Sequence, residues 1–127
     1  MSDFLRGDQF GQSNFSIKPN QLPTKAPSLD YLTIKKASLV FRAINHKLRQ
    51  EMIRLIDKKG QATVTEIFVD LRLEQSVASQ HLAILRRAGI VLTEREGKYM
   101  YYKLNLDRLG MINQIVSDLL KLFNQIF

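Results

Sequence analysis

Residues 75–91 read QSVASQHLAILRRAGIV, a helical pattern that ends at a glycine. Ala78, Leu82 and Leu85 recur at the spacing of one helix face, which predicts a side packed on a core. Another side carries short uncharged hydrogen-bonding groups, where a solvated face usually carries Glu and Lys. Its residues are Ser76, Ser79, Gln80, Ala83 and Arg87. A side of that chemistry predicts contact with another molecule.

A helix that enters the DNA major groove needs such a side. Gln can bridge two edge groups of adenine, Ser can donate or accept a hydrogen bond, and a small methyl group can meet thymine. Arginines at the end of the helix fall where phosphates flank the groove. The residues predicted to contact DNA are Gln75, Ser76, Ser79, Gln80, Ala83, Arg86 and Arg87. The alternative is a surface helix whose small residues pack on a neighbouring element.

Helical spacing predicts three further helices before this one. The first is expected to begin near Ser28, as its N-cap, with Asp30 in the first turn. The second lies within HKLRQEMIRLIDKKG, residues 46–60, and ends at its glycine. The third is short and begins at a capping box formed by Thr63 and Glu66, with Thr65 as the alternative cap.

The stretch IVLTEREGKYMYYKL, residues 90–104, alternates about Gly97, which predicts a β-hairpin. A basic tip beside a groove-reading helix would meet the next phosphates or a minor groove. The tip residues predicted to contact DNA are Arg95, Lys98, Tyr99 and Tyr101. The alternative is plain solvated charge, since Glu94 and Glu96 partly cancel the basic residues.

The predicted order is helix, helix, helix, turn, helix, hairpin, helix. The fold class is therefore mostly α with a small β-hairpin, in the winged helix-turn-helix arrangement. This domain is expected over residues 29–127, and Asn105 can cap its last helix. Residues 1–28 hold all three prolines and show no periodicity, which predicts an N-terminal arm that is flexible or packed on the body or a partner chain.

Composition agrees with a polyanionic partner. The chain of 127 residues has 19 Lys and Arg against 12 Asp and Glu, a net charge of +7. Many small domains are basic for no specific reason, so the position of the charges must decide. The absence of cysteine removes disulfides, thiolate metal sites and thiol redox sensing. With no apolar run of about 18 residues and no secretory signal pattern, a cytoplasmic protein without a membrane partner is expected.

Three stretches together resemble the ArsR/SmtB-type repressors. QSVASQHLAILRRAGIV resembles the recognition-helix motif of that family, AINHKLRQEMI at residues 43–53 resembles the entry to its second helix, and EGKYMYYKL at residues 96–104 resembles its wing. The resemblance spans about residues 32–104. It implies a homodimeric winged-helix transcription regulator, usually a repressor, that dimerises through its first and last helices.

The last helix agrees with this implication, because it carries more apolar surface than one small core would cover. The residues expected at a dimer interface are Leu32, Leu39, Leu109, Ile112, Val116, Leu119, Phe123 and Ile126. The alternative is a last helix folded back on its own monomer. The expected partners are therefore double-stranded DNA and a second copy of the chain.

The metal sites of the family are not expected here. Both thiolate positions of the family's metal-binding segment are threonines, Thr63 and Thr65, and the last helix has no histidine.

His81 is predicted to pack and to hydrogen-bond to the backbone. Arg72 stands where relatives often have glycine, so a left-handed backbone there would be strained. No metal, cofactor-binding or catalytic residue is predicted, and no enzyme is expected, because no nucleophile–base pair or phosphate loop is found.

The expected function is therefore sequence-specific DNA binding by a transcriptional regulator. We expect a homodimeric repressor that reads a pseudo-palindromic operator with helix 75–89 and a basic wing at residues 95–99. The alternative is a winged-helix protein–protein interaction module that does not bind DNA. The sequence leaves open the operator, the choice between repression and activation, and whether the effector is a small molecule, a protein or absent.

Overall fold

A computed structural model describes residues 28–126. Nearly all of the predicted arm, residues 1–28, therefore lies outside the described residues, as does the side chain of Ile126. The described chain divides into two units. One unit is residues 35–106, and the other combines residues 28–34 with residues 107–126.

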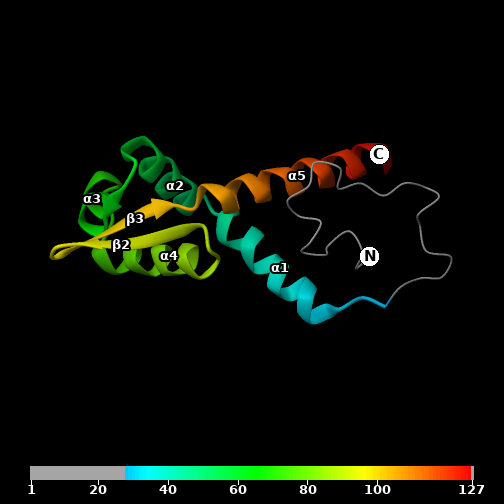
Figure 1. The fold of residues 1–127 in the computed structure, drawn as a ribbon, viewed down its shortest axis with the longest axis horizontal. Helices are drawn as coiled ribbons and strands as arrows, with labels where there is room; N and C mark the ends of the chain where they lie inside the picture. Colours follow the sequence, from blue (N-terminus) through cyan, green and yellow to red (C-terminus); the bar gives the residue numbers. More distant parts are fainter. Residues whose placement is uncertain (1–27, 127) are drawn as a thin grey trace. The chain divides into compact units, whose positions relative to one another are not determined.

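The described elements follow the predicted order with one addition (Figure 1). They are α1 (Tyr31–Ile44), α2 (Lys47–Lys59), β1 (Ala62–Thr63), α3 (Val64–Asp70), α4 (Gln75–Arg87), β2 (Val91–Glu96), β3 (Tyr99–Leu104) and α5 (Leu106–Ile126). The addition is β1, which pairs antiparallel with β3 and makes a three-stranded sheet of order β1-β3-β2. The predicted hairpin is confirmed as β2 and β3. The strand β1 was not predicted, because two residues are too few to show an alternating pattern.

The first helix begins later than predicted. The carboxylate of Asp30 accepts hydrogen bonds from the backbone N–H of Thr33 at 3.2 Å and from its hydroxyl at 2.6 Å. Asp30 directly precedes the first helical residue, so its side chain reaches the third amide of α1, as an N-cap does. The prediction that Ser28 is the N-cap was therefore wrong.

The predicted caps at α2 and α3 are confirmed. Gly60 ends α2 with a φ of 84°, and its N–H donates to the carbonyl of Ile56 at 2.8 Å. The backbone N–H of Glu66 donates to the Thr63 hydroxyl, and the Glu66 carboxylate accepts from the Thr63 N–H, both at 3.2 Å. This capping box determines where α3 starts and so where the turn into α4 lies.

The core of residues 35–106 lies between α2, α3, α4 and the sheet. Its largest fully buried side chains are Met52, Ile56, Ile67, Leu82, Leu85, Ile90 and Val91. Ala78, Leu82 and Leu85 of α4 are 0% exposed, which confirms the predicted buried side of that helix. Each buried Leu contributes about 2 kcal/mol of transfer free energy, so this side of α4 is strongly held. The opposite side must therefore face solvent.

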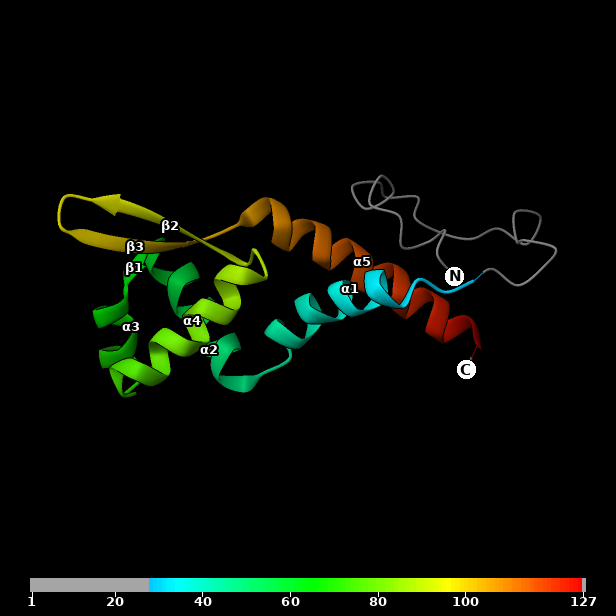
Figure 2. The ribbon, with the colours of Figure 1, turned by 90° about the horizontal axis from the view of Figure 1, so that it is seen from below.

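The hairpin carries side chains beyond the core. β2 and β3 pair from Val91 with Leu104 to Glu96 with Tyr99. Gly97, with a φ of 62°, makes the turn. In two perpendicular views the hairpin extends past α3 and α4 (Figures 1 and 2). Within residues 28–126, no helix has the length and apolar character needed to cross a membrane.

Candidate nucleic-acid interface

The α4 residues predicted to contact DNA lie on the solvent side of the helix. All seven are exposed, namely Gln75, Ser76, Ser79, Gln80, Ala83, Arg86 and Arg87. The helix contains no carboxylate and has two arginines in its last turn. The exposed side thus offers hydrogen-bonding groups, one methyl group and positive charge, and nothing on α4 itself would repel a phosphate.

The turn between α3 and α4 is held by backbone hydrogen bonds. After α3, the N–H of Leu73 donates to the Phe68 carbonyl at 2.8 Å, and the N–H of Arg72 donates to the Val69 carbonyl at 3.2 Å. This Schellman pattern needs a left-handed residue, and Arg72 has a φ of 57°. Arg72 thus adopts the left-handed backbone, which costs roughly 1 kcal/mol for a non-glycine residue.

The tip of the wing, residues 95–99, carries the predicted basic residues into solvent. Arg95, Lys98 and Tyr99 are exposed, and Tyr101 is partly buried. The Lys98 ammonium lies 5.5 Å from the centre of the Tyr99 ring, a cation–π contact that keeps the charge near the tip. The Tyr99 and Tyr101 ring centres are 6.5 Å apart.

One of the two wing carboxylates has a partner on the neighbouring strand. Glu94 forms a salt bridge with Lys103, and its hydrogen bond raises the pKa of Lys103 above the ordinary lysine value. Because the charge of Glu94 is balanced within the sheet, the charge at the tip is set by Arg95 and Lys98 against Glu96. The tip itself therefore keeps a net charge of +1.

Arg49 has a structural role that the sequence did not reveal. Its side chain is buried, and its guanidinium donates to the Ala43 carbonyl at 2.6 Å and to the Arg42 carbonyl at 3.0 Å. Those carbonyls belong to the last turn of α1, where a helix leaves carbonyls without internal partners. Gln50 donates similarly to the Ile44 carbonyl at 3.0 Å. The start of α2 therefore caps the end of α1.

His81 hydrogen-bonds to a side chain and not to the backbone, so that part of its prediction was wrong. Its Nδ1 lies 3.0 Å from a guanidinium nitrogen of Arg49. Arginine can only donate, so Nδ1 of His81 is the acceptor and carries no proton. The ring centres of His46 and His81 are 4.8 Å apart. His46 itself caps α2, because its Nδ1 accepts from the Leu48 N–H at 3.2 Å.

Acidification is expected to destabilise the protein through His81. Burial lowers the pKa of His81, and the neighbouring His46 and Arg49 lower it further. A group whose pKa is lowered by folding stabilises the fold above its unfolded value, about 6.5, and loses that stabilisation as pH falls. We therefore expect the midpoint temperature of thermal unfolding to decrease as the pH is lowered below about 6.5. His81→Asn, which keeps an acceptor near Nδ1, should flatten that decline; an equal decline in this variant would contradict the assignment.

Thr63, one of the two threonines expected to stand in place of metal-binding thiolates, has a structural role. The hydroxyl of Thr63 is used in the capping box of α3. Over residues 28–126, no group of three or more His, Cys, Asp and Glu side chains is arranged to hold a metal ion.

Several residues expected at a dimer interface present apolar surface to solvent in the single chain. Leu32, Leu39, Val116 and Phe123 are exposed, Leu109 and Leu119 are partly buried, and Ile112 is 8% exposed. Leu32, Leu39 and Val116 are thus large apolar side chains exposed in the described part of the chain.

Known proteins share this architecture. The family described as "Bacterial regulatory protein, arsR family" matches residues 46–93. An uncharacterised HTH-type transcriptional regulator of Methanocaldococcus jannaschii is 33% identical over 85 residues, 67% of this chain and 96% of that protein. The transcriptional repressor PagR of Bacillus anthracis is 28% identical, with a TM-score of 0.52 over 60% of this chain and 86% of PagR.

A second solved structure is the homodimeric winged helix-turn-helix DNA-binding domain Mb0332 of Mycobacterium bovis. It is 25% identical, with a TM-score of 0.57 over 74% of this chain and 91% of that one. The winged helix-turn-helix fold is therefore confirmed. With its helix-turn-helix, its wing and these relatives, the chain belongs to the arsR family of bacterial regulatory proteins, and it is a DNA-binding transcriptional regulator rather than an enzyme.

Proposed function

We propose that the protein is a homodimeric repressor that reads a pseudo-palindromic operator with α4 and the wing. One observation carries the proposal: α4 has a fully buried apolar stripe and, opposite it, an exposed side with no carboxylate. PagR, which this chain resembles, is described as a transcriptional repressor, and that likeness supports repression here.

The α4 residues divide by chemistry into base and phosphate contacts. Gln80 bridges two edge groups of adenine, while Ser76 and Ser79 donate to or accept from base edges. Ala83 permits close approach to the groove. Gln75 adds an amide at the start of the helix, and Arg86 and Arg87 contact phosphates. At the wing, Arg95 and Lys98 meet the next phosphates or a minor groove, with Tyr99 and Tyr101 packed behind them.

A two-fold dimer sets the spacing of the half-sites. Two copies related by a two-fold axis place their α4 helices in successive major grooves, about 34 Å apart. The exposed apolar residues Leu32, Leu39, Val116 and Phe123 supply surface for such an interface. The homodimeric state named for the Mycobacterium bovis relative supports the same assembly.

Selection of bound duplexes from a random pool tests the DNA-binding proposal. We expect enrichment of an inverted repeat whose half-sites lie about one helical turn apart. Affinity for the selected duplex should fall steeply with salt, with a logarithmic slope near −0.9 for each neutralised phosphate. A duplex with five added base pairs between the half-sites is the control and should bind weakly. No enrichment, or affinity independent of salt, would support the interaction-module alternative instead.

The dimer is tested by placing a charge in the proposed interface. Val116→Glu is expected to shift the sedimenting species from dimer to monomer, because burying an unpaired carboxylate costs several kcal/mol. Ser117→Glu adds the same charge at an exposed neighbouring position of α5 and should leave the dimer intact. Equal dissociation of both variants would place the interface elsewhere.

A further inference from the structure

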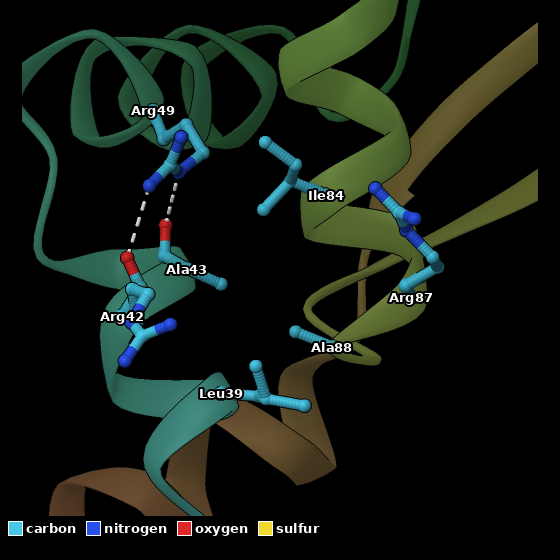
Figure 3. Close-up of a pocket in the computed structure, with 7 residues that line it drawn as sticks. All are labelled: Leu39, Arg42, Ala43, Arg49, Ile84, Arg87 and Ala88. Carbon is cyan, nitrogen blue, oxygen red and sulfur yellow. Dashed lines mark hydrogen bonds between the residues drawn. The ribbon is translucent and has the colours of Figure 1, made fainter. Parts of the chain in front are cut away.

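The C-terminal parts of α1 and α4 face each other across a cavity of about 360 Å³ (Figure 3). Leu39 and Ala43 line it from α1, and Ile84 and Ala88 line it from α4 and its C-cap. All of these residues belong to the unit of residues 35–106. Because a space of this size lies between them, the side chains of the two helices are not close-packed there. The position of α4 relative to α1 therefore depends on another connection.

Arg49 of α2 supplies that connection, because its guanidinium contacts both helices. Two of its nitrogens donate to the carbonyls of Arg42 and Ala43 in the last turn of α1, at 3.0 Å and 2.6 Å (Figure 3). A third nitrogen donates to Nδ1 of His81, in the middle of α4, at 3.0 Å. Arg49 is only 7% exposed, and its guanidinium is a rigid planar fork. The three bonds thus hold α4 at a fixed position relative to the end of α1.

The bond to His81 is not needed to cap α1. The two bonds to the Arg42 and Ala43 carbonyls are sufficient for that cap. Nδ1 of His81 accepts from Arg49 across a sequence separation of 32 residues and adds the recognition helix to the same network. This third bond therefore has a consequence for the position of α4 and not only for the stability of α1.

The position of α4 relative to α1 matters for DNA binding in a dimer. Leu39, on α1, belongs to the proposed dimer surface, and α4 carries the side proposed to read DNA. In a two-fold dimer, the geometry between these two helices sets the separation of the two α4 helices. We propose that Arg49 and His81 are positioning residues that hold α4 in place relative to α1 and so determine which half-site spacing the protein accepts. This inference rests on the proposed function.

The physical scale of the effect follows from the geometry of DNA. One base pair added between the half-sites moves the second one by about 3.4 Å along the duplex and turns it by about 35°. A dimer with rigidly held α4 helices therefore discriminates strongly between neighbouring spacings. A dimer in which α4 moves by a few ångströms relative to α1 discriminates weakly.

The spacing role is tested with duplexes that carry the selected half-site as an inverted repeat and differ by one base pair in spacing. Fluorescence anisotropy is measured at pH 8, above the pKa of His81, which burial lowers. His81→Ala removes the acceptor on α4 and leaves both carbonyl bonds of Arg49 in place. The affinity ratio between the preferred spacing and its neighbours should fall by about twofold to thirtyfold. A duplex with one half-site should be bound equally by both proteins.

Two further variants separate positioning from a loss of stability. His81→Asn keeps an acceptor near the place of Nδ1 and should retain the spacing preference of the parent protein. Ile56→Val shortens a buried side chain of α2, about 10 Å along the helix from Arg49, and so destabilises the fold without altering the link. It should also keep the preference. A preserved preference in His81→Ala, or an equal loss in Ile56→Val, would overturn the positioning role.

A distance measurement without DNA tests the same inference on the protein alone. The chain has no cysteine, so Ser79→Cys on the exposed side of α4 provides one spin-label position in each copy. The distance between the two labels of the dimer should be narrowly distributed. Adding His81→Ala should broaden the distribution, because α4 is then less firmly held. An equally narrow distribution in that variant would contradict the inference.

The outcomes distinguish this inference from the proposed function. If selection yields no inverted repeat, or the labels show no distance between two copies, the dimeric repressor itself is contradicted and the spacing role is lost with it. If the parent protein has a sharp spacing preference that His81→Ala shares, only the positioning role is contradicted. If His81→Ala also binds the single half-site more weakly by the same factor, His81 acts on the DNA-reading side of α4 and not on its position.

Discussion

Replacing Arg49 with alanine is expected to lower the free energy of unfolding by about 3 kcal/mol, measured by urea denaturation at pH 7. Arg49 is 7% exposed, and its guanidinium donates to two carbonyls at the end of α1 and to His81. A hydrogen bond involving a charged group contributes roughly 1.5–3 kcal/mol, and each buried acceptor left without a donor costs about 1–3 kcal/mol. Water that enters the cavity lined by Arg42, Ala43 and Arg49 can hydrogen-bond to these carbonyls and so reduces the cost.

Two variants separate the capping role of Arg49 from a general effect of charge. Arg49→Lys keeps the positive charge but loses the planar fork that reaches both carbonyls, so it should recover only part of the stability. Arg54→Ala removes an exposed arginine of the same helix and should cost less than about 0.5 kcal/mol. If Arg49→Lys were as stable as the parent protein, the charge and not the fork would account for the effect.

Replacing Gln80 with glutamate is expected to weaken binding to the selected operator by roughly tenfold to hundredfold. A carboxylate accepts at both oxygens and cannot donate to the ring acceptor of adenine, so the two-point contact proposed for Gln80 is lost, which is worth about 1–3 kcal/mol. The added negative charge also lies close to the phosphates. Fluorescence anisotropy with a labelled duplex at fixed salt measures the change. Because Gln80 is exposed, the thermal midpoint should be unaffected.

Gln125→Glu is the matched control, since it makes the same chemical change at an exposed position of α5. It alters the net charge of the protein equally, so any general electrostatic effect on DNA affinity appears in both variants. Only Gln80→Glu should also change which bases are selected at the half-site. Equal losses in the two variants would remove Gln80 from the interface.

Much of the fold was predictable because it depends on residues one or two helical turns apart. The buried side of α4 follows from the spacing of Ala78, Leu82 and Leu85, and the start of α3 follows from Thr63 and Glu66. The one error of this local kind concerns α1, where Ser28 and Asp30 are both good caps and only the actual first turn distinguishes them. The DNA contacts of the α4 and wing residues remain predictions. The structure shows that these side chains are exposed, as a DNA contact requires, and exposure alone does not identify the partner.

The sequence by itself determined the order of helices, the position of the wing and the chemistry of the exposed side of α4. All of these depend on periodicity, on caps and on residue type, which act locally along the chain. The tertiary structure alone decided the partner of His81, which lies 32 positions from Arg49, and the pairing of β1 with β3. It alone placed Arg42 and Arg87 at one cavity. Contacts of this kind join segments whose separation in sequence carries no periodic signal, so only the packing of the core brings them together.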